Sequence, residues 1–264
     1  MASINSSPGR DKFGSDPAAY DAARPGYPDE LFDWLREACE LGPQSDCFEI
    51  GAGTGHATLP LLPHTRSLIA IEPDTSLAEY LGRRADDPRL AVIVRRFEDV
   101  DLPASFFDAG FCATAFHWLP RMKSFAKIVA GLRPGGHFAM WWDVYHDPAR
   151  PDDFDRAISH LFAGLEEEPR KTASRPAFAL DVNSRTGEMR AAGFVDVQHR
   201  RFDRTIAFTP ERLAALYATF SRVRMAPADI REGLLAEVRR IATEDFAGQV
   251  QREIVTSTYV GRRR

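Results

Sequence analysis

The chain has 264 residues, of which 44% are hydrophobic and 27% are charged, and its net charge is −4. This is enough apolar material for one large core, or for one core with an appended lobe, so we expect a single globular unit. A chain with more acidic than basic side chains lacks the positive field that attracts nucleic acid or an anionic membrane surface. A small or neutral partner is therefore favoured, with no nucleic acid and no membrane.

Cysteine usage and the N-terminal segment indicate the compartment. Cys39, Cys47 and Cys112 show no C-x-x-C spacing, so they are expected to be small core residues in a reducing compartment. Residues 1–14 are rich in Ser, Pro and Gly without an apolar signal region, and nowhere do eighteen uninterrupted apolar residues occur. A cytoplasmic protein is the expectation.

In chain order, short apolar runs alternate with segments of helix length. A helix is expected over 29–41, and strands over 47–50, 67–71, 90–94, 107–113 and 137–142. Helices are expected between strands at 75–85 and 122–132, the second closed by a turn over 133–136. Such alternation is typical of an α/β fold whose parallel strands are joined by crossover helices.

The pattern breaks at residues 143–181, which are interpreted as an insertion with a short helix over 158–165. Regular structure is expected to return as a helix near 184–192, a strand over 194–202, helices over 210–220 and 227–246, and a strand over 253–260. The predicted organisation is a flexible leader over 1–28 and a domain over 29–264, with cap insertions at about 143–183 and 209–250.

The most informative stretch runs from Phe48 to His56, where an apolar strand leads into Gly51, Gly53 and Gly55 and then into a helix. Three glycines let the backbone turn sharply and approach a bulky polar ligand near a helix N-terminus. A dinucleotide site would space its glycines G-x-G-x-x-G, whereas here the third glycine arrives one residue early. This spacing disfavours a nicotinamide cofactor.

Two carboxylates flank this loop. Glu49 precedes the first glycine and offers a partner for an ammonium group or a water, although a loop or capping role is the alternative. Glu72 closes the second strand, where a carboxylate can accept hydrogen bonds from both hydroxyls of a ribose. A buried carboxylate without a partner would cost several kcal/mol. Together the two residues predict a nucleoside pocket.

Several stretches together resemble class I S-adenosylmethionine-dependent methyltransferases. The resemblance covers the glycine loop from Glu49 to Gly55, the second-strand acid within 70–74, the fourth strand within 107–111 and the turn over 132–136. Tyr20 with Arg24 to Pro28, and Ala115 to Trp118, are similar to signatures of a small-molecule group that includes trans-aconitate and ubiquinone-pathway methyltransferases.

This resemblance implies an α/β, doubly wound, Rossmann-like sheet of seven mostly parallel strands in the order 3-2-1-4-5-7-6, with helices on both faces and a helical cap. It also implies S-adenosylmethionine as the cofactor. The implied cofactor-binding residues are Tyr20, Arg24, Glu49, Gly51, Ala52, Gly53, Gly55, Glu72, Pro73, Phe97, Glu98, Thr114 and Ala115.

Among these residues, Gly51, Ala52 and Gly53 would face the methionine part of the cofactor. Phe97 and Glu98 resemble the place where adenine is held, although Arg96 departs from the family's pattern there, and Phe97 can instead be core. Residues 1–28 would fold over the cofactor as a lid in which Arg24 grips the methionine carboxylate. The alternative is an N-terminal helix packed on the sheet, with Arg24 in solvent.

His117 is the candidate catalytic residue because it follows strand four at the carboxyl edge of the sheet. With an ordinary pKa near neutrality it would take a proton from a hydroxyl or amine acceptor, or only position a carboxylate. A purely structural role is the alternative. The acceptor pocket should be roofed by the leader and the cap, with candidate aromatic residues Trp141, Trp142, Tyr145, Phe178, Tyr217 and Phe220.

The sulfonium of the cofactor is already a strong electrophile, so few catalytic residues are needed. We expect methyl transfer to a small organic molecule, with a hydroxyl or carboxyl oxygen favoured. A protein or RNA methyltransferase and a non-catalytic cofactor-binding protein are the alternatives. No metal-ligand spacing, G-x-S-x-G elbow or P-loop lysine occurs, so we expect no metal and neither hydrolase nor phosphotransfer chemistry.

Overall fold

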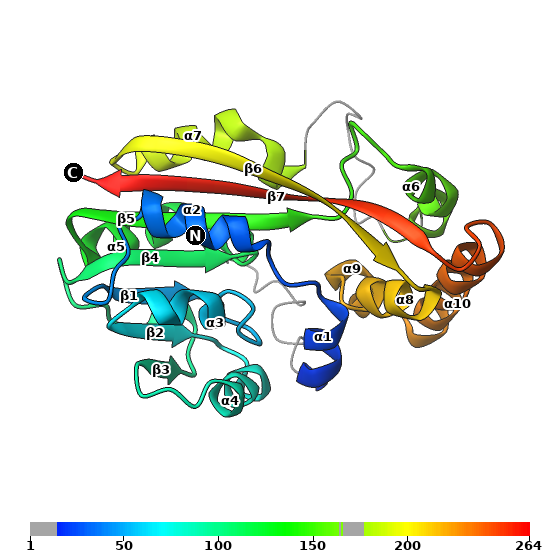
Figure 1. Cartoon of the computed structure of the whole chain (residues 1–264), viewed down its shortest axis with the longest axis horizontal. Helices are drawn as coiled ribbons and strands as arrows, with labels where there is room; N and C mark the ends of the chain where they lie inside the picture. Colours follow the sequence, from blue (N-terminus) through cyan, green and yellow to red (C-terminus); the bar gives the residue numbers. More distant parts are fainter. Residues whose placement is uncertain (1–14, 164, 166–176) are drawn as a thin grey trace, which may run out of the picture.

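The computed structural model describes residues 15–163, 165 and 177–264, and a seven-stranded sheet runs through its centre (Figure 1). The strand order is β3-β2-β1-β4-β5-β7-β6. Strands β1 to β5 pair in parallel, and β7 runs antiparallel to both β5 and β6. The predicted fold class and strand order are confirmed. The strands are β1 Asp46–Ile50, β2 Ser67–Ile71, β3 Leu90–Ile93, β4 Phe107–Ala113, β5 Leu132–Val144, β6 Phe194–Phe208 and β7 Val250–Arg263.

Helices cover both faces of the sheet. On one face, Leu31 and Leu35 of α2 and Leu61 of α3 share an apolar core with the sheet residue Trp141. On the other face, residues of α5 and α7 pack around the sheet residue Phe138. The helices are α1 Pro17–Ala23, α2 Asp29–Ala38, α3 Thr58–Leu61, α4 Thr75–Arg84, α5 Arg121–Gly131, α6 Asp153–Ile158, α7 Val182–Ala191, α8 Pro210–Ala218, α9 Ser221–Met225 and α10 Ala228–Glu244.

Helix α4 illustrates why the local sequence folds as it does. The Asp74 carboxylate accepts hydrogen bonds from the backbone amides of Ser76 and Leu77, at 2.9 and 3.2 Å, and so caps the helix. Leu77 and Leu81, one turn apart, point into the core. The first turn of α4 is thereby fixed directly after Glu72, at the carboxyl edge of the sheet.

The predicted turn over 133–136 is wrong, because β5 already begins at Leu132. Leu132 pairs with Phe107, but His137 pairs with Ala109, so a bulge absorbs the extra residues within the strand. Gly135, with a φ of +82°, takes the backbone conformation that this irregularity requires. Strands β6 and β7 are also longer than predicted, because they continue to pair with each other beyond the shorter parallel strands.

Helices α6, α8, α9 and α10 form a lobe beyond one end of the sheet (Figure 1). Its own apolar core includes Phe154, Leu213 and Val238, together with Ile254 of β7. The predicted helix over 158–165 is wrong: a capping box of Asp152 and Asp155 starts α6 earlier, and a 3-10 turn follows it. The short helix α9 was missed, since five residues carry too little periodicity to be recognised.

The leader predicted over 1–28 is only partly described, and residues 1–14 of it lie outside the described residues. Its described part contains α1, which is capped by the Asp16 side chain. Asp21 of α1 pairs with Arg84 of α4, and Arg24 donates a hydrogen bond to Thr219 at the end of α8. Helix α1 thus bridges the sheet and the helical lobe.

Three further sequence expectations concern the whole chain. Cys39, Cys47 and Cys112 are buried and unpaired. None of the helices within the described ranges combines the length and apolar character that crossing a membrane requires. In the same part of the chain, no group of three His, Cys, Asp or Glu side chains is arranged to hold a metal ion.

Candidate active site

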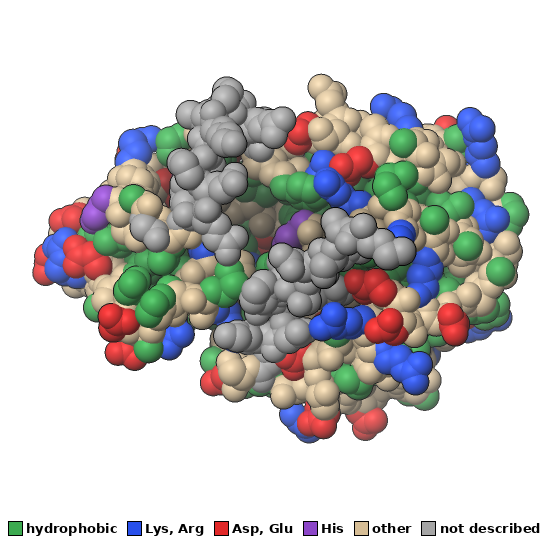
Figure 2. Space-filling model, turned by 180° about the vertical axis from the view of Figure 1, so that it is seen from behind, with side chains coloured by type: hydrophobic (Ala, Val, Ile, Leu, Met, Phe, Trp, Pro, Cys, Tyr) green, Lys and Arg blue, Asp and Glu red, His purple; other side chains and the backbone are tan. Residues whose placement is uncertain are grey.

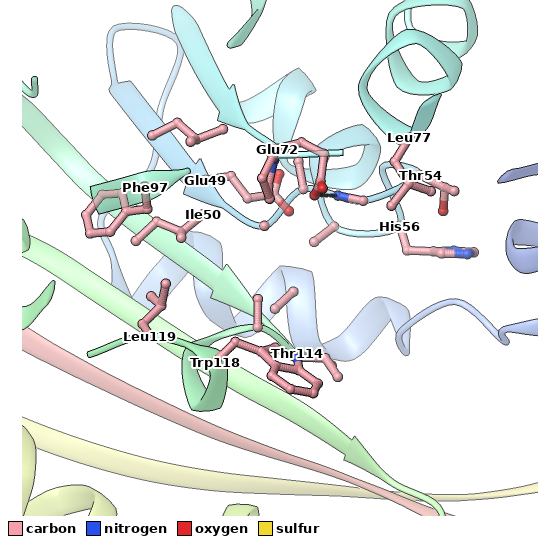
Figure 3. A pocket seen from close by; sticks show the side chains of 18 of the residues that line it. Glu49, Ile50, Thr54, His56, Glu72, Leu77, Phe97, Thr114, Trp118 and Leu119 are labelled. Atoms are coloured by element: carbon pink, nitrogen blue, oxygen red, sulfur yellow. Dashed lines mark hydrogen bonds between the residues drawn. The ribbon is translucent and has the colours of Figure 1, made fainter. Parts of the chain in front are cut away.

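A pocket of about 920 Å³, including its open mouth, lies at the carboxyl edge of the sheet (Figure 3). Its walls come from the ends of β1, β2 and β4 and from α1. The lining includes ten of the predicted cofactor-binding residues, namely Tyr20, Glu49, Gly51, Ala52, Gly53, Glu72, Pro73, Phe97, Thr114 and Ala115. Arg24, Gly55, Glu98 and His117 lie outside this lining.

The glycine loop forms the floor of the pocket, and at two positions only glycine fits. Gly51 has a φ of +71°, and a Cβ atom there would lie 2.5 Å from the Cβ of Ala115. Gly55 has a φ of +94°, and a Cβ atom there would lie 2.5 Å from Leu81 of α4. Gly51 therefore lets the loop pass close to the end of β4, whereas Gly55 lets it pack against α4.

Glu72 holds the glycine loop in place. Its Oε2 accepts a hydrogen bond from the Gly53 amide at 2.9 Å, and its Oε1 accepts one from the Asp74 amide at 2.9 Å. The side chain is almost fully buried but lines the pocket, and Figure 3 shows the bond to the loop. Because each carboxylate oxygen has two lone pairs, both oxygens can still accept a hydrogen bond from a ligand.

Glu49 is a fully buried carboxyl group with one satisfied oxygen. Its Oε2 accepts a hydrogen bond from the Thr58 hydroxyl at 2.6 Å, while its Oε1 is buried and has no hydrogen-bond partner among the described residues. Burial raises the pKa of Glu49 to about 8, with the nearby Glu72 carboxylate adding to the shift. A ligand ammonium group in the pocket would offset the free-energy cost of burying this oxygen without a hydrogen-bond partner.

Phe97 and Glu98 occupy different environments. Phe97 is buried and lines the pocket, and the Nζ atom of Lys127 lies 5.0 Å from the centre of its ring. Glu98 is exposed, and its backbone carbonyl accepts a hydrogen bond from the same Nζ atom at 3.0 Å. Of the two residues, it is the Phe97 ring that a ligand in the pocket would meet.

A second cavity, of about 300 Å³ including its opening, adjoins the first. It shares four lining residues with the first pocket and adds Arg24, Pro25, Asp143 and Tyr145. Arg24 lies here and not in open solvent: its Nε donates to the Thr219 hydroxyl at 2.8 Å, and the rings of Tyr145 and Phe220 lie 5.2 Å from its Cζ atom. The shared residues are Tyr20, Tyr27, His56 and Thr114.

Thr114 stands at the junction of the two cavities. It adopts a φ of +53°, which is uncommon for a β-branched residue and marks local strain. Its backbone amide donates to the Trp141 carbonyl at 2.7 Å, and its hydroxyl shares a 2.9 Å hydrogen bond with the Tyr27 hydroxyl. The strained backbone turns this hydroxyl toward Tyr27, which follows α1.

Asp143 is a buried acid of the second cavity that sequence reasoning missed. Its Oδ2 accepts a hydrogen bond from Arg204 at 2.7 Å, and the hydroxyl of Thr256 donates to Oδ1. Burial raises its pKa above the usual range for an aspartate, against the effect of Arg204. Its place at the carboxyl end of β5 was the available signal, but residue 143 was read as the start of an insertion.

Other pocket residues were also missed by the sequence, chiefly because apolar residues of strand ends look like core. His56, which follows the glycine loop, lines both cavities, and its Nε2 lies 3.1 Å from Asp21 of α1. Burial lowers the pKa of His56 below its usual value. The remaining members are Ile50, Thr54, Ala57, Ile71, Leu77, Ala113, Trp118 and Leu119.

His117 lies in a 3-10 turn after β4 and lines neither cavity, although its neighbour Trp118 lines the first pocket. Its Nδ1 accepts a hydrogen bond from Trp142 Nε1 at 3.1 Å. His117 is solvent-exposed, and partial desolvation by the surrounding protein lowers the pKa of its ring to about 4. The direction of this shift is away from the expected titration near neutrality.

The candidate aromatic residues separate into two groups. Tyr145 lines the second cavity and Phe220 packs on Arg24 beside it. Trp142 and Phe178 contact each other and His117. In contrast, Trp141 lies in the core between sheet and helices, and Tyr217 lies in the core of the helical lobe.

Comparison with known proteins agrees with this geometry. A family model described as a methyltransferase domain matches residues 48–140, which span the glycine loop and strands β2 to β4. An uncharacterised methyltransferase of Mycobacterium tuberculosis is 27% identical over 232 residues, covering 87% of this chain and 84% of that protein. Residues 48–140 thus carry a methyltransferase domain, and the chain is a methyltransferase that uses S-adenosylmethionine.

Solved structures share the fold of this methyltransferase. The YcgJ protein of Bacillus subtilis superposes with a TM-score of 0.59 and 15% identity, covering 89% of this chain and 98% of that one. Phosphoethanolamine N-methyltransferase 2 of Haemonchus contortus, in complex with S-adenosyl-L-methionine, superposes with a TM-score of 0.58 and 14% identity. That match covers 95% of this methyltransferase and 57% of the Haemonchus chain.

Proposed function

We propose that this methyltransferase acts on a small organic molecule and methylates one of its oxygen atoms, with a carboxylate favoured. The observation that carries the proposal is the pair of adjoining cavities, which share Tyr20, Tyr27, His56 and Thr114. An acceptor in the second cavity would lie next to a cofactor in the first. Tyrosine rings together with a few converging polar groups, such as Arg24, Asp143 and Thr114, suit the binding of a small molecule.

The surface also favours a small acceptor over RNA. On the face shown in Figure 2, basic and acidic side chains are intermixed over the described residues. Binding of RNA relies on a continuous basic face with exposed aromatic side chains. The resemblance to the group that includes trans-aconitate and ubiquinone-pathway methyltransferases points in the same direction.

We assign the cofactor-binding roles from the same geometry. The unpartnered oxygen of Glu49 would accept a hydrogen bond from the ammonium group of the cofactor, and Glu72 from its ribose hydroxyls. Phe97 would pack against the adenine, as part of a wall that includes Pro73. Arg24 would pair with the methionine carboxylate where the two cavities meet, and Thr114 and Ala115 would flank the methyl group. Gly55 and Glu98 would act only through the backbone that they shape.

Methyl transfer requires few catalytic groups from the protein. When bound, S-adenosylmethionine supplies an electrophilic methyl group on a positively charged sulfur. An acceptor oxygen forms the new bond to the methyl carbon while the carbon–sulfur bond breaks and its electron pair stays on sulfur. A carboxylate acceptor needs no base for this step. The residues of the two cavities would align the acceptor and exclude water.

A transfer assay with methyl-labelled cofactor tests the proposal on a panel of carboxylic acids, phenols, alcohols and amines. We expect label in an acid, released again by mild alkali because a methyl ester is base-labile. Gly51→Val is the matched control, since its side chain would clash with Ala115 and block the pocket. Label in protein or RNA alone, or cofactor binding without any transfer, would favour the alternatives of a macromolecular target or a binding protein.

A further inference from the structure

Trp142 determines which nitrogen of His117 carries the proton. The indole N–H can only donate, and it donates to His117 Nδ1 at 3.1 Å. Nδ1 must therefore present its lone pair, so a neutral His117 carries its proton on Nε2. Turning the ring over would place a carbon against the indole N–H and leave a buried donor unpaired. Trp142 is only 4% exposed and sits within β5, so its donor is held in place.

The groups around His117 keep it neutral. Its ring packs against Trp118 and Phe178, with ring centres 4.9 and 6.3 Å away. Phe178 in turn lies under two guanidinium groups, Arg121 at the start of α5 and Arg185 of α7. No carboxylate lies within 4 Å of His117 among the residues that the structure describes. Nothing there stabilises an imidazolium ion, in agreement with its lowered pKa.

Charged groups of both signs lie beyond Phe178, namely the cations Arg121 and Arg185 and the carboxylates of Glu188 and Asp181. Glu188 Oε1 accepts a hydrogen bond from Arg121 at 2.8 Å and another from Arg185 at 3.0 Å, so two cations share one carboxylate. Arg185 is 4% exposed, and its Nε and Nη1 atoms have no hydrogen-bond partner among the described residues. The unpaired donor atoms of Arg185 favour the approach of an anion on this side of Phe178.

We propose that His117 is a hydrogen-bond donor to an anionic oxygen of the acceptor and not a general base. The only lone pair of the neutral ring faces Trp142, so Nε2–H is what the ring can offer to a substrate. His117 itself lines neither cavity, but its neighbour Trp118 lines the first pocket on the side opposite Glu72 (Figure 3). The acceptor would therefore extend from the junction of the two cavities past Trp118 to reach Nε2. A carboxylate fits this donor, since one oxygen can accept the hydrogen bond while the other is methylated and no proton is transferred.

The assignment of an anionic acceptor rests on the proposed function, whereas the protonation state of His117 does not. Nitrogen NMR measures that protonation state directly. Histidine is labelled with ¹⁵N, and the His117 signals are identified by their loss in His117→Gln. We expect the Nε2–H form throughout a range of about pH 5.5 to 8. A proton on Nδ1, or a midpoint between about pH 6 and 7, would overturn the donor role whatever the acceptor is.

The variant Trp142→Phe tests whether the indole donor of Trp142 sets the protonation state of His117. It removes the indole donor but keeps an aromatic ring, so His117 should show a mixture of both neutral forms and titrate closer to its ordinary value. Retention of the wild-type spectrum in folded Trp142→Phe would contradict the role of Trp142. The same measurement on His64, which lies in the 3-10 turn after α3 beside the core on the other face of the sheet, serves as the internal control and should not change.

Turnover of the acid identified in the transfer assay separates a donor from a base. The Gln side chain places an amide N–H near the position of Nε2, whereas Phe keeps a ring without a donor. We expect His117→Gln to retain kcat/KM within about fivefold, and His117→Phe to lose about 10- to 100-fold. Equal losses of about 10²-fold or more in both variants, with a rate that rises through the wild-type pKa, would indicate a base.

Discussion

The backbone amide of Gly53 donates a hydrogen bond to Oε2 of Glu72 at 2.9 Å, so the acid that ends β2 also fixes the loop that follows β1. We propose that ligand recognition depends on the same carboxylate as the loop conformation. A substitution at Glu72 acts on both at once, and this makes the residue a sensitive probe of the pocket.

Glu72→Ala is expected to weaken binding of S-adenosylhomocysteine by about 1.5 to 3 kcal/mol, the range for losing charge-assisted hydrogen bonds. Isothermal titration measures this. Glu79→Ala, on the exposed side of α4, removes a carboxylate from a surface pair with Arg83 and should bind normally. Unchanged affinity in folded Glu72→Ala would remove Glu72 from the binding site.

Ligand selectivity follows from the spacing of the glycines. Gly51 and Gly55 bring the loop against Ala115 and Leu81 in a turn that differs from a dinucleotide loop. We expect the protein to bind S-adenosylmethionine and S-adenosylhomocysteine but not NAD, as measured by titration of all three. Binding of NAD alone would show that the loop has been assigned to the wrong cofactor.

The buried Glu49 carboxyl makes stability depend on pH in a predictable direction. Its pKa is raised from 4.5 to about 8 in the folded protein, so between these values unfolding releases a proton. The stabilisation is complete below about pH 4.5 and is lost as the pH rises through 8. Without ligand, Glu49→Gln should flatten the decline of Tm over this range; an identical decline in wild type and variant would argue against the raised pKa.

Ligand binding should favour the ionised form of the Glu49 carboxyl, whereas the ligand-free protein favours the neutral form. If an ammonium group pairs with ionised Glu49, the affinity for S-adenosylhomocysteine rises with pH up to about 8 and binding releases a proton. Titrations in buffers of different ionisation enthalpy count that proton. Glu49→Gln should abolish the release, and a wild-type protein that releases none would place the ammonium group elsewhere.

The lid prediction is tested by hydrogen exchange. Helix α1 and the residues after it, 15–28, contribute Tyr20 and Tyr27 to the first pocket. Cofactor bound there should slow amide exchange in this segment, while α10 in the helical lobe, which contributes nothing to either cavity, should exchange at an unchanged rate. Equal exchange of 15–28 with and without saturating ligand would count against a lid.

Local patterns were sufficient for the sheet and the glycine loop, because strand periodicity, Gly51 and the acid Glu72 lie within short stretches of chain. The contacts that shape the site join segments that are far apart in the sequence. Trp142 and His117 are 25 residues apart on neighbouring strand ends, and no sequence pattern predicts their hydrogen bond or the lowered pKa of His117. Asp143 was missed because residue 143 was read as the start of an insertion, and its pairing with Arg204 of β6 could not be predicted from local sequence.

The C-terminal half of α1 is anchored twice, by Asp21 to α4 and by its C-cap residue Arg24 to the end of α8. Tyr20, directly before the first anchor, belongs to the walls of both cavities. A displacement of α1 would therefore change a wall of both cavities at once, so exchange of the two ligands would be coupled through this one short helix.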